Sequence, residues 1–214
     1  MIKKLTLVFI MAAFVMGGAF AQFGMSAGIG AFYGTDFGSG IEATVSGVNI
    51  AFEMPHSGIG FFGFVDIGSV EVSAGYFSSK GDWAVSATGG GLSSSNSMGE
   101  VSFTSINVGL LLKYPLAMGG FTVFPAAGIE YYYLLSAQSG STTYTDHEKI
   151  SQLWIKAGAG LDIMMSNSMY IRATALYGIK MPNELEKELV NKHPDFKPRM
   201  GHGFTIKLGI GFSI

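Results

Sequence analysis

The last fourteen residues of the chain, GHGFTIKLGIGFSI, alternate between large, mostly apolar side chains and small or polar ones. A period of two residues places successive side chains on opposite faces of a β-strand. One face of this strand is therefore apolar along its length, and the other is small or polar. A strand of this kind is typical of a transmembrane β-barrel, which shows its apolar face to lipid. The apolar positions are Phe204, Ile206, Leu208, Ile210, Phe212 and Ile214.

The composition favours strands over helices. Only 13% of the 214 residues are charged, against about 25% in ordinary soluble domains. Glycine occurs 31 times, although each glycine costs a helix about 1 kcal/mol relative to alanine. The absence of cysteine excludes a disulfide scaffold and a zinc–thiolate site. The net charge of −2 gives no indication of a nucleic-acid partner.

The first residues have the pattern of a secretory signal peptide. Lys3 and Lys4 precede an uncharged apolar stretch, residues 5–20, and Ala19-Phe20-Ala21 matches the small-x-small cleavage pattern. We expect residues 1–21 to be removed and residues 22–214 to form one β-barrel domain. The alternative, an anchor helix, would need a longer apolar stretch, because a membrane span takes about 20 residues.

Seven further segments alternate in the same way, so the sequence predicts eight strands. The connections between them are alternately long and short, which places all the long ones at one end. An even number of strands of about ten residues, with long loops at one end, is the signature of an outer-membrane barrel. The predicted fold is therefore all-β, an eight-stranded antiparallel transmembrane up-and-down β-barrel. The predicted strands are residues 23–33, 59–67, 69–78, 102–114, 121–135, 152–165, 169–181 and 201–214.

Several local features refine this prediction. Residues 44–52 form a short strand-like piece that could extend a hairpin beyond the membrane. Residues 79–100 are a low-complexity run, which we expect to be a mobile loop. Pro125 removes a donor from its strand, so we expect a bulge there. Asn183 and Glu186 have the spacing of a capping box, which predicts one short surface helix.

The alternation assigns eight charged side chains to the interior of the barrel and essentially none to its exterior. Lipid contact demands this asymmetry, since a Lys or Arg at the bilayer midplane costs about 2–4 kcal/mol. Buried charges are usually paired, and the interior holds equal numbers of each sign. The polar interior and apolar exterior exclude a lipocalin. The acids are Asp66, Glu71, Glu130 and Asp162, and the bases are Lys113, Lys156, Arg172 and Lys207.

Three interpretations of these charges compete. The favoured one is a structural network that fills a barrel too narrow for a water channel. The second is a narrow or gated pathway for small solutes. The third is a catalytic carboxylate pair, although paired acids are expected in such a network anyway.

Aromatic residues fall at strand ends on the predicted outward face, where two girdles would anchor a barrel at the membrane interfaces. Strand propensity alone would account for their number but not for their placement. On the short-turn side they are Phe23, Tyr114, Phe121 and Phe212, and on the long-loop side Tyr33, Tyr76, Tyr133, Tyr177 and Phe204.

No motif supports an enzyme or a metal site, so we predict no catalytic residues, no cofactor and no metal. The four histidines, His56, His147, His193 and His202, lack metal-ligand spacing, although adventitious metal binding at His147 and His193 is an alternative. A lipid-modifying barrel enzyme would need a Ser–His–acid set on its lipid-facing side, and His202 has no convincing partners of that kind. The glycine pairs of residues 28–30 and 158–160 lie inside strands, where they would let interior side chains approach.

With these residues in view, the sequence resembles the small eight-stranded outer-membrane proteins of the OmpA-barrel, OmpX and OmpW group. The stretches FVDIGSVEVSAGYF and GFTIKLGIGFSI are similar to the small barrel proteins of spirochaetes. The resemblance covers the whole mature chain, and it implies insertion by the outer-membrane assembly machinery, which reads the final strand. Such strands usually end in Phe, whereas this one ends in Phe212-Ser213-Ile214.

The predicted function follows from these points. We expect an integral protein of the bacterial outer membrane with a structural or surface-interaction, adhesin-like role. Its partners would be outer-membrane lipids, the assembly machinery and extracellular ligands at the loops. The alternative is a narrow channel for passive uptake of small or hydrophobic solutes.

Overall fold

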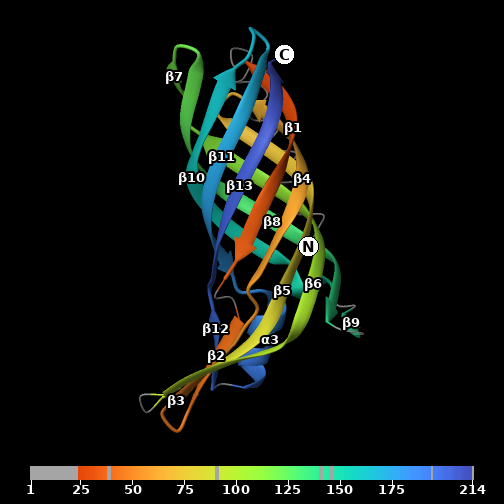
Figure 1. Ribbon diagram of the computed structural model, residues 1–214, viewed down its shortest axis with the longest axis vertical. Helices are drawn as coiled ribbons and strands as arrows, with labels where there is room; N and C mark the ends of the chain where they lie inside the picture. The colour runs from red at the N-terminus through yellow and green to blue at the C-terminus, as the bar shows by residue number, and fades with distance from the viewer. Residues whose placement is uncertain are drawn as a thin grey trace.

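The computed structural model describes residues 24–37, 40–89, 92–139, 142–144, 147–193 and 195–213. Eight antiparallel strands pair in sequence around a closed ring, because β5 pairs with both β4 and β6, and β13 pairs with both β11 and β1. The predicted fold class is confirmed (Figure 1). The predicted signal peptide and Phe23 lie outside the described residues. The ring strands are β1 (Met25–Asp36), β4 (His56–Ile67), β5 (Val70–Gly89), β6 (Leu92–Lys113), β8 (Phe121–Ser139), β10 (Gln152–Met164), β11 (Met169–Met181) and β13 (Gly201–Ser213).

The strand register gives the stagger of the barrel. A path that starts at Phe121 on β8 and crosses each strand to its paired residue returns to β8 at Tyr131, ten residues further along. A stagger of this size over eight strands corresponds to a strand tilt of about 35–45°. A barrel of eight strands has an interior just wide enough for side chains to fill.

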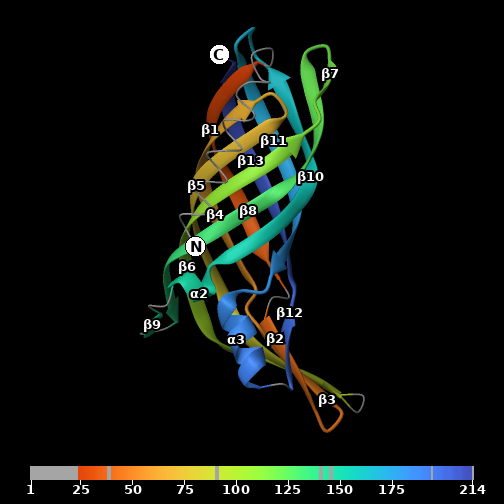
Figure 2. The ribbon, with the colours of Figure 1, turned by 180° about the vertical axis from the view of Figure 1, so that it is seen from behind.

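The two ends of the barrel differ. Three short connections, at residues 68–69, 114–120 and 165–168, lie at what we call the turn end, at the top of Figure 1. The opposite end, the loop end, carries an extension built from the outer parts of β5 and β6 together with β2, β3 and β12 (Figures 1 and 2). Outside the ring, β7 (Leu116–Met118) lies at the turn end (Figure 1). The elements at the loop end (Figures 1 and 2) are β2 (Gly40–Val45), β3 (Val48–Glu53), β9 (Thr142–Tyr144), α2 (His147–Ile150), α3 (Glu184–Lys192) and β12 (Phe196–Arg199).

The prediction of a mobile loop at residues 79–100 is wrong for the part of it that the structure describes. β5 and β6 run on past the barrel as one long hairpin, paired as far as Gly89 and Leu92. The ladder of the barrel presents each added residue with a partner, so a Ser-rich sequence continues as strand. A small apolar cluster that includes Val101 and Phe103 also supports the base of this hairpin, and Trp83 packs against that cluster.

The expected bulge at Pro125 is not present. β8 stays in register with β10 through Pro125, which lies opposite Ala159. On its other side β6 has ended at Lys113, and the Tyr114 amide donates to the Pro125 carbonyl at 3.1 Å. The missing N–H therefore faces the gap between β6 and β7, where no ladder donor is required. Among the described residues, register shifts occur instead at Trp83/Ala84 and Thr104/Ser105.

One local prediction is corrected and one is confirmed. Residues 44–52 are not a single strand-like piece, because the chain turns at residues 46–47 between β2 and β3; the hairpin so formed does extend beyond the barrel. The capping box forms at the start of α3, where the Glu186 amide donates to Asn183 Oδ1 and the Asn183 amide donates to Glu186 Oε2, both at 2.9 Å. Among the described residues, no helix is long and apolar enough to cross a membrane.

Interior side chains pack as aromatic layers between the strands. Glycines on facing strands make room for the rings, because a Cβ at Gly160 would overlap the ring of Phe124 and one at Gly28 would overlap that of Phe64. This is the role expected for Gly28 and Gly160, and Gly30 makes room for the Phe62 ring in the same way. A Cβ at Gly158 would instead meet the backbone of Ala175 and Leu176. The central layers contain Phe32, Phe62, Phe64, Phe77, Tyr132, Trp154 and Tyr170.

Candidate functional site

The interior of the barrel is the candidate site, because the strands aim polar and charged side chains into it. All eight charged residues predicted to face inward do so. Seven are buried, and Asp162 has a side chain that is 13% exposed. The structure divides them into two clusters, separated along the barrel axis.

The turn-end cluster consists of Asp66, Glu71, Lys113, Asp162 and Arg172. Arg172 is its centre: Nε and Nη2 donate to the two Asp162 carboxylate oxygens at 2.7 Å, and Nη1 donates to Glu71 at 2.9 Å. Nη2 also lies 2.8 Å from Asp66. Lys113 pairs with Asp66 and lies 3.3 Å from Glu71. The planar guanidinium suits such multiple pairing.

Aromatic rings complete the surroundings of Arg172. Its guanidinium carbon lies 4.6 Å from the ring centre of Phe64, 5.0 Å from that of Tyr170 and 5.2 Å from that of Phe124. A cation over aromatic faces is attracted to them, and the attraction strengthens where water is excluded. Ions and rings together therefore fill this end of the barrel.

The central cluster consists of Glu130, Lys156 and Lys207. Glu130 is 1% exposed and pairs with both Lys156 and, at 3.2 Å, Lys207. It also accepts from Asn107 Nδ2 at 2.8 Å and from the Tyr132 hydroxyl at 3.0 Å. Lys156 Nζ donates further to Thr205 Oγ1 at 2.8 Å. Strands on several sides of the barrel are thus tied to one carboxylate.

The four acids and four bases are therefore not divided evenly between the two clusters. The turn-end cluster has three carboxylates and two bases, and the central cluster has one carboxylate and two bases. Sequence alternation assigns a side chain to the interior but not to a height along the barrel, so it could not predict this division. Asn107, Tyr132 and Thr205 were also missed, although all three have inward parity in predicted strands.

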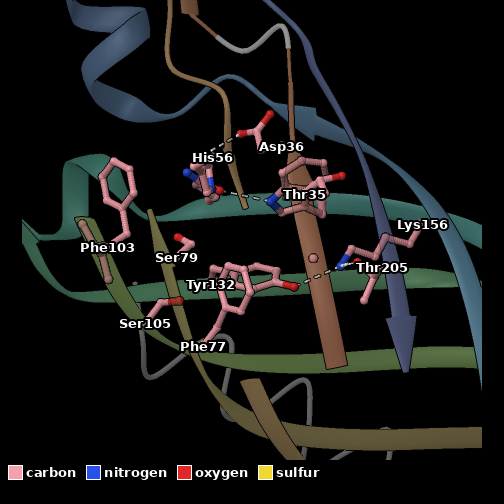
Figure 3. Close-up of a pocket in the computed structure, with 14 residues that line it drawn as sticks. Thr35, Asp36, His56, Phe77, Ser79, Phe103, Ser105, Tyr132, Lys156 and Thr205 are labelled. Carbon is pink, nitrogen blue, oxygen red and sulfur yellow. Dashed lines mark hydrogen bonds and ion pairs between the residues drawn. The ribbon is translucent and has the colours of Figure 1, made fainter. Parts of the chain in front are cut away.

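A small cavity lies between the central cluster and the loop end (Figure 3). Lys156, Tyr132 and Thr205 line one side of it, and Asp36 and His56 line the other. Its volume is about 30 Å³, which is room for one to a few waters. The cavity is not large enough for an organic solute.

Three buried groups toward the loop end, Asp36, His56 and Lys180, were not predicted as site residues. His56 Nδ1 lies 3.7 Å from Asp36, and burial lowers the pKa of His56 even though Asp36 opposes that shift. Lys180, 1% exposed, binds Glu186 of α3 at 3.0 Å and so ties that helix to the barrel. The inward parity of Lys180 within its strand was the available signal. Asp36 and His56 lay in a segment predicted as loop.

The residues around the cavity do not form a catalytic triad. The hydroxyl of Ser79 is buried and has no hydrogen-bond partner, so it is not paired with His56. Within the described ranges, no group of three His, Asp or Glu side chains could hold a metal ion.

The described aromatics of the two predicted girdles all lie exposed on the outside of the barrel. Tyr177 forms part of a group at the loop end, where its ring lies 5.2 Å from that of Phe204 and its hydroxyl lies 2.7 Å from His202 Nδ1. The residues are Tyr33, Tyr76, Tyr114, Phe121, Tyr133, Tyr177, Phe204 and Phe212.

Comparisons with known proteins give a structural likeness only. No family model matches the chain, and no curated protein matches its sequence. The outer-membrane protein OprG of Pseudomonas aeruginosa is similar with a TM-score of 0.46 and 12% identity, over 90% of this chain and 96% of OprG.

Two further structures are similar to this chain. The attachment invasion locus protein Ail of Yersinia pestis, solved with a heparin analogue, gives a TM-score of 0.38 and 13% identity, over 90% of this chain and all of Ail (100%). The N-terminal barrel domain of Pseudomonas aeruginosa OprF gives a TM-score of 0.37 and 14% identity, over 88% of this chain and 97% of that domain. The comparisons do not support the finer resemblance to spirochaete proteins. The chain is thus similar in structure to small outer-membrane β-barrels, at a level that identifies no function.

Proposed function

We propose that this chain is a non-conducting integral protein of the bacterial outer membrane whose extension at the loop end makes surface contacts. The observation that carries the proposal is the interior, closed by two successive charge clusters. Each buried ion of the two clusters has a counter-ion within hydrogen-bonding distance. An ion entering the barrel would have to displace these pairs.

The exterior supports a membrane location. Its exposed side chains between the two sets of aromatics are predominantly apolar: alanines alternate with large residues such as Ile29 at 72%, Phe61 at 67% and Leu208 at 57%. An apolar surface that continues around a barrel is much larger than the patches found on soluble monomers. A closed barrel also leaves no strand edge unsatisfied in lipid.

The loop-end extension supports the surface role. It projects beyond the barrel as a paired sheet, and two exposed valines, Val45 and Val48, flank the tip of its β2–β3 hairpin (Figure 1). Its partners would be extracellular ligands, whereas the barrel itself would contact lipids and, through the final strand, the assembly machinery.

Planar-bilayer recording tests the closed interior. Refolded protein is expected to give no reproducible conductance, and Glu130→Ala, which breaks the central cluster, is the matched variant. Steady conductance of the unsubstituted protein would refute the proposal. Such conductance would support the alternative, a narrow pathway for small solutes. The observation in favour of that alternative is the cavity between the central cluster and the loop end.

The surface role has its own test. Cells that display the protein are compared, for adhesion to immobilised matrix proteins, with cells that display a variant in which residues 84–97 are replaced by Asn-Gly. The shortened hairpin is expected to reduce adhesion while the barrel still folds. Equal adhesion of the two would count against a surface role for this hairpin.

A further inference from the structure

One hairpin at the turn end differs from the other connections there. Two of the connections are tight: residues 68–69 are Gly-Ser, and residues 165–168 are Met-Ser-Asn-Ser. The third, between β6 and β8, instead forms the extra strand β7 and stands at the side of the barrel in both Figures 1 and 2. Its length is not needed to connect neighbouring strands.

The hairpin leaves the ring at Lys113. The Lys113 amide still donates, at 2.7 Å, to the carbonyl of Ser69, the residue that directly precedes β5. β7 then pairs with β8 alone among the described strands. Gly119, with a φ of +68°, forms the tip. A positive φ is easily adopted only by glycine.

One face of this hairpin is apolar throughout. The pairs Leu116–Val123 and Met118–Phe121 place these side chains on the same face as the exterior of β8. Met118 is 53% exposed, Leu116 is 42% exposed and Phe121 is 41% exposed. Tyr114, at 69%, lies beside them. Residues 114–129 contain no charged residue.

This face continues the apolar exterior of the barrel. Phe121 lies opposite Ile163 on β10, which in turn lies opposite Ile171 on β11, and both isoleucines are exposed. A hydrophobic surface without any charge matches acyl chains better than it matches water or a polar protein surface.

We propose that the β7–β8 hairpin is a wedge that inserts its apolar face into the acyl chains of the leaflet next to the turn end. Its partner is the phospholipid of that leaflet, so the inference rests on the membrane location proposed above. The wedge widens the contact of the barrel with one leaflet on the β8 side only.

Spin-label accessibility tests the proposal, and the cysteine-free chain gives a clean background. Single variants Met118→Cys, Ile210→Cys and Asn167→Cys are labelled with a nitroxide and refolded into dimyristoylphosphatidylcholine vesicles. Position 210 reports on the barrel exterior, and position 167 on a polar turn at the same end. The ratio of collisions with oxygen to collisions with a water-soluble nickel chelate is measured at each position.

The label at position 118 is expected to resemble that at 210, with a higher ratio than at 167. A water-like label at 118 beside a lipid-like label at 210 would overturn the wedge but leave the membrane location standing. A water-like label at 210 would overturn the membrane location itself. A label at 118 shielded from both agents, or broadened by a second spin, would overturn the wedge in favour of contact with a second copy.

Discussion

Glu130 is the residue whose replacement should damage the barrel most. It is the one carboxylate of the central cluster, and Glu130→Gln would leave the ammonium groups of Lys156 and Lys207 buried without a counter-ion there. Removing one partner of a buried pair costs about 3–5 kcal/mol. The whole free energy of unfolding of a domain is about 5–15 kcal/mol, so the variant should lose a large part of it.

Lys207→Met should lower the free energy of unfolding much less than Glu130→Gln does, although it also breaks the ion pair between Lys207 and Glu130. The substitution leaves Glu130 and Lys156 as a one-to-one pair, and the apolar stem still packs near the Phe62 ring. A lost hydrogen bond to a charged group is worth about 1.5–3 kcal/mol, but the burial cost of one ion disappears with it. We expect a net loss below about 2 kcal/mol from these two opposing effects.

Urea unfolding in lipid vesicles measures both variants. Tryptophan fluorescence is a suitable signal, because Trp154 lies in the central aromatic layer and 5.7 Å from Lys156 Nζ. Lys80→Met is the matched control, since the exposed Lys80–Glu100 pair should leave the midpoint unchanged. A loss for Glu130→Gln no larger than that for Lys207→Met would refute the view that the central cluster depends on its single acid.

Two further predictions concern other parts of the fold. Burial holds the pKa of His56 below its value of about 6.5 in the unfolded chain. As the pH falls, the imidazole is thus protonated in the unfolded chain before it is protonated in the folded one. Stability should therefore fall as the pH drops below about 6.5, by up to about 1.4 kcal/mol per pH unit, and urea titrations of His56→Gln should lack that part of the slope. Gly160→Ala would push a methyl into the Phe124 ring and should cost about 1–3 kcal/mol. Gly63→Ala, whose new methyl would meet no atom closer than 3.8 Å, should leave the urea midpoint unchanged.

Much of the barrel could be predicted from alternation alone. An apolar exterior and a polar, packed interior make the period of two unambiguous, and the predicted strands coincide with those of the ring to within a few residues, apart from the outward extension of β1, β4, β5, β6 and β8. The failures came where other forces decide. The Ser-rich residues 79–100 carry no strand signal of their own, and they pair because the ladder below them is already formed.

The sequence predicted which charged side chains point into the barrel, but not which of them lie next to one another. Parity identified Glu130 and Arg172 as inward residues, yet the height of each on a tilted strand depends on the stagger between strands. That stagger is set by the pairing of the whole ring. The contact of Lys180 with α3 was out of reach for a further reason, since it joins a strand to a helix that local spacing predicts but does not position.

The charged interior also specifies which register the barrel can adopt. A slip of one residue in any strand would turn its inward side chains toward lipid. Near the midplane an exposed Lys or Arg costs about 2–4 kcal/mol, and less toward the interfaces, so a slip that turned Lys156 or Lys207 outward would remove a substantial part of the stability of a typical domain, which is about 5–15 kcal/mol. Apolar side chains at the same positions would carry no such penalty, because they are equally tolerated on both faces. Ion pairs add little net stability over well-packed apolar groups, and their larger effect, in the membrane location proposed above, is to disfavour registers that turn these charges outward.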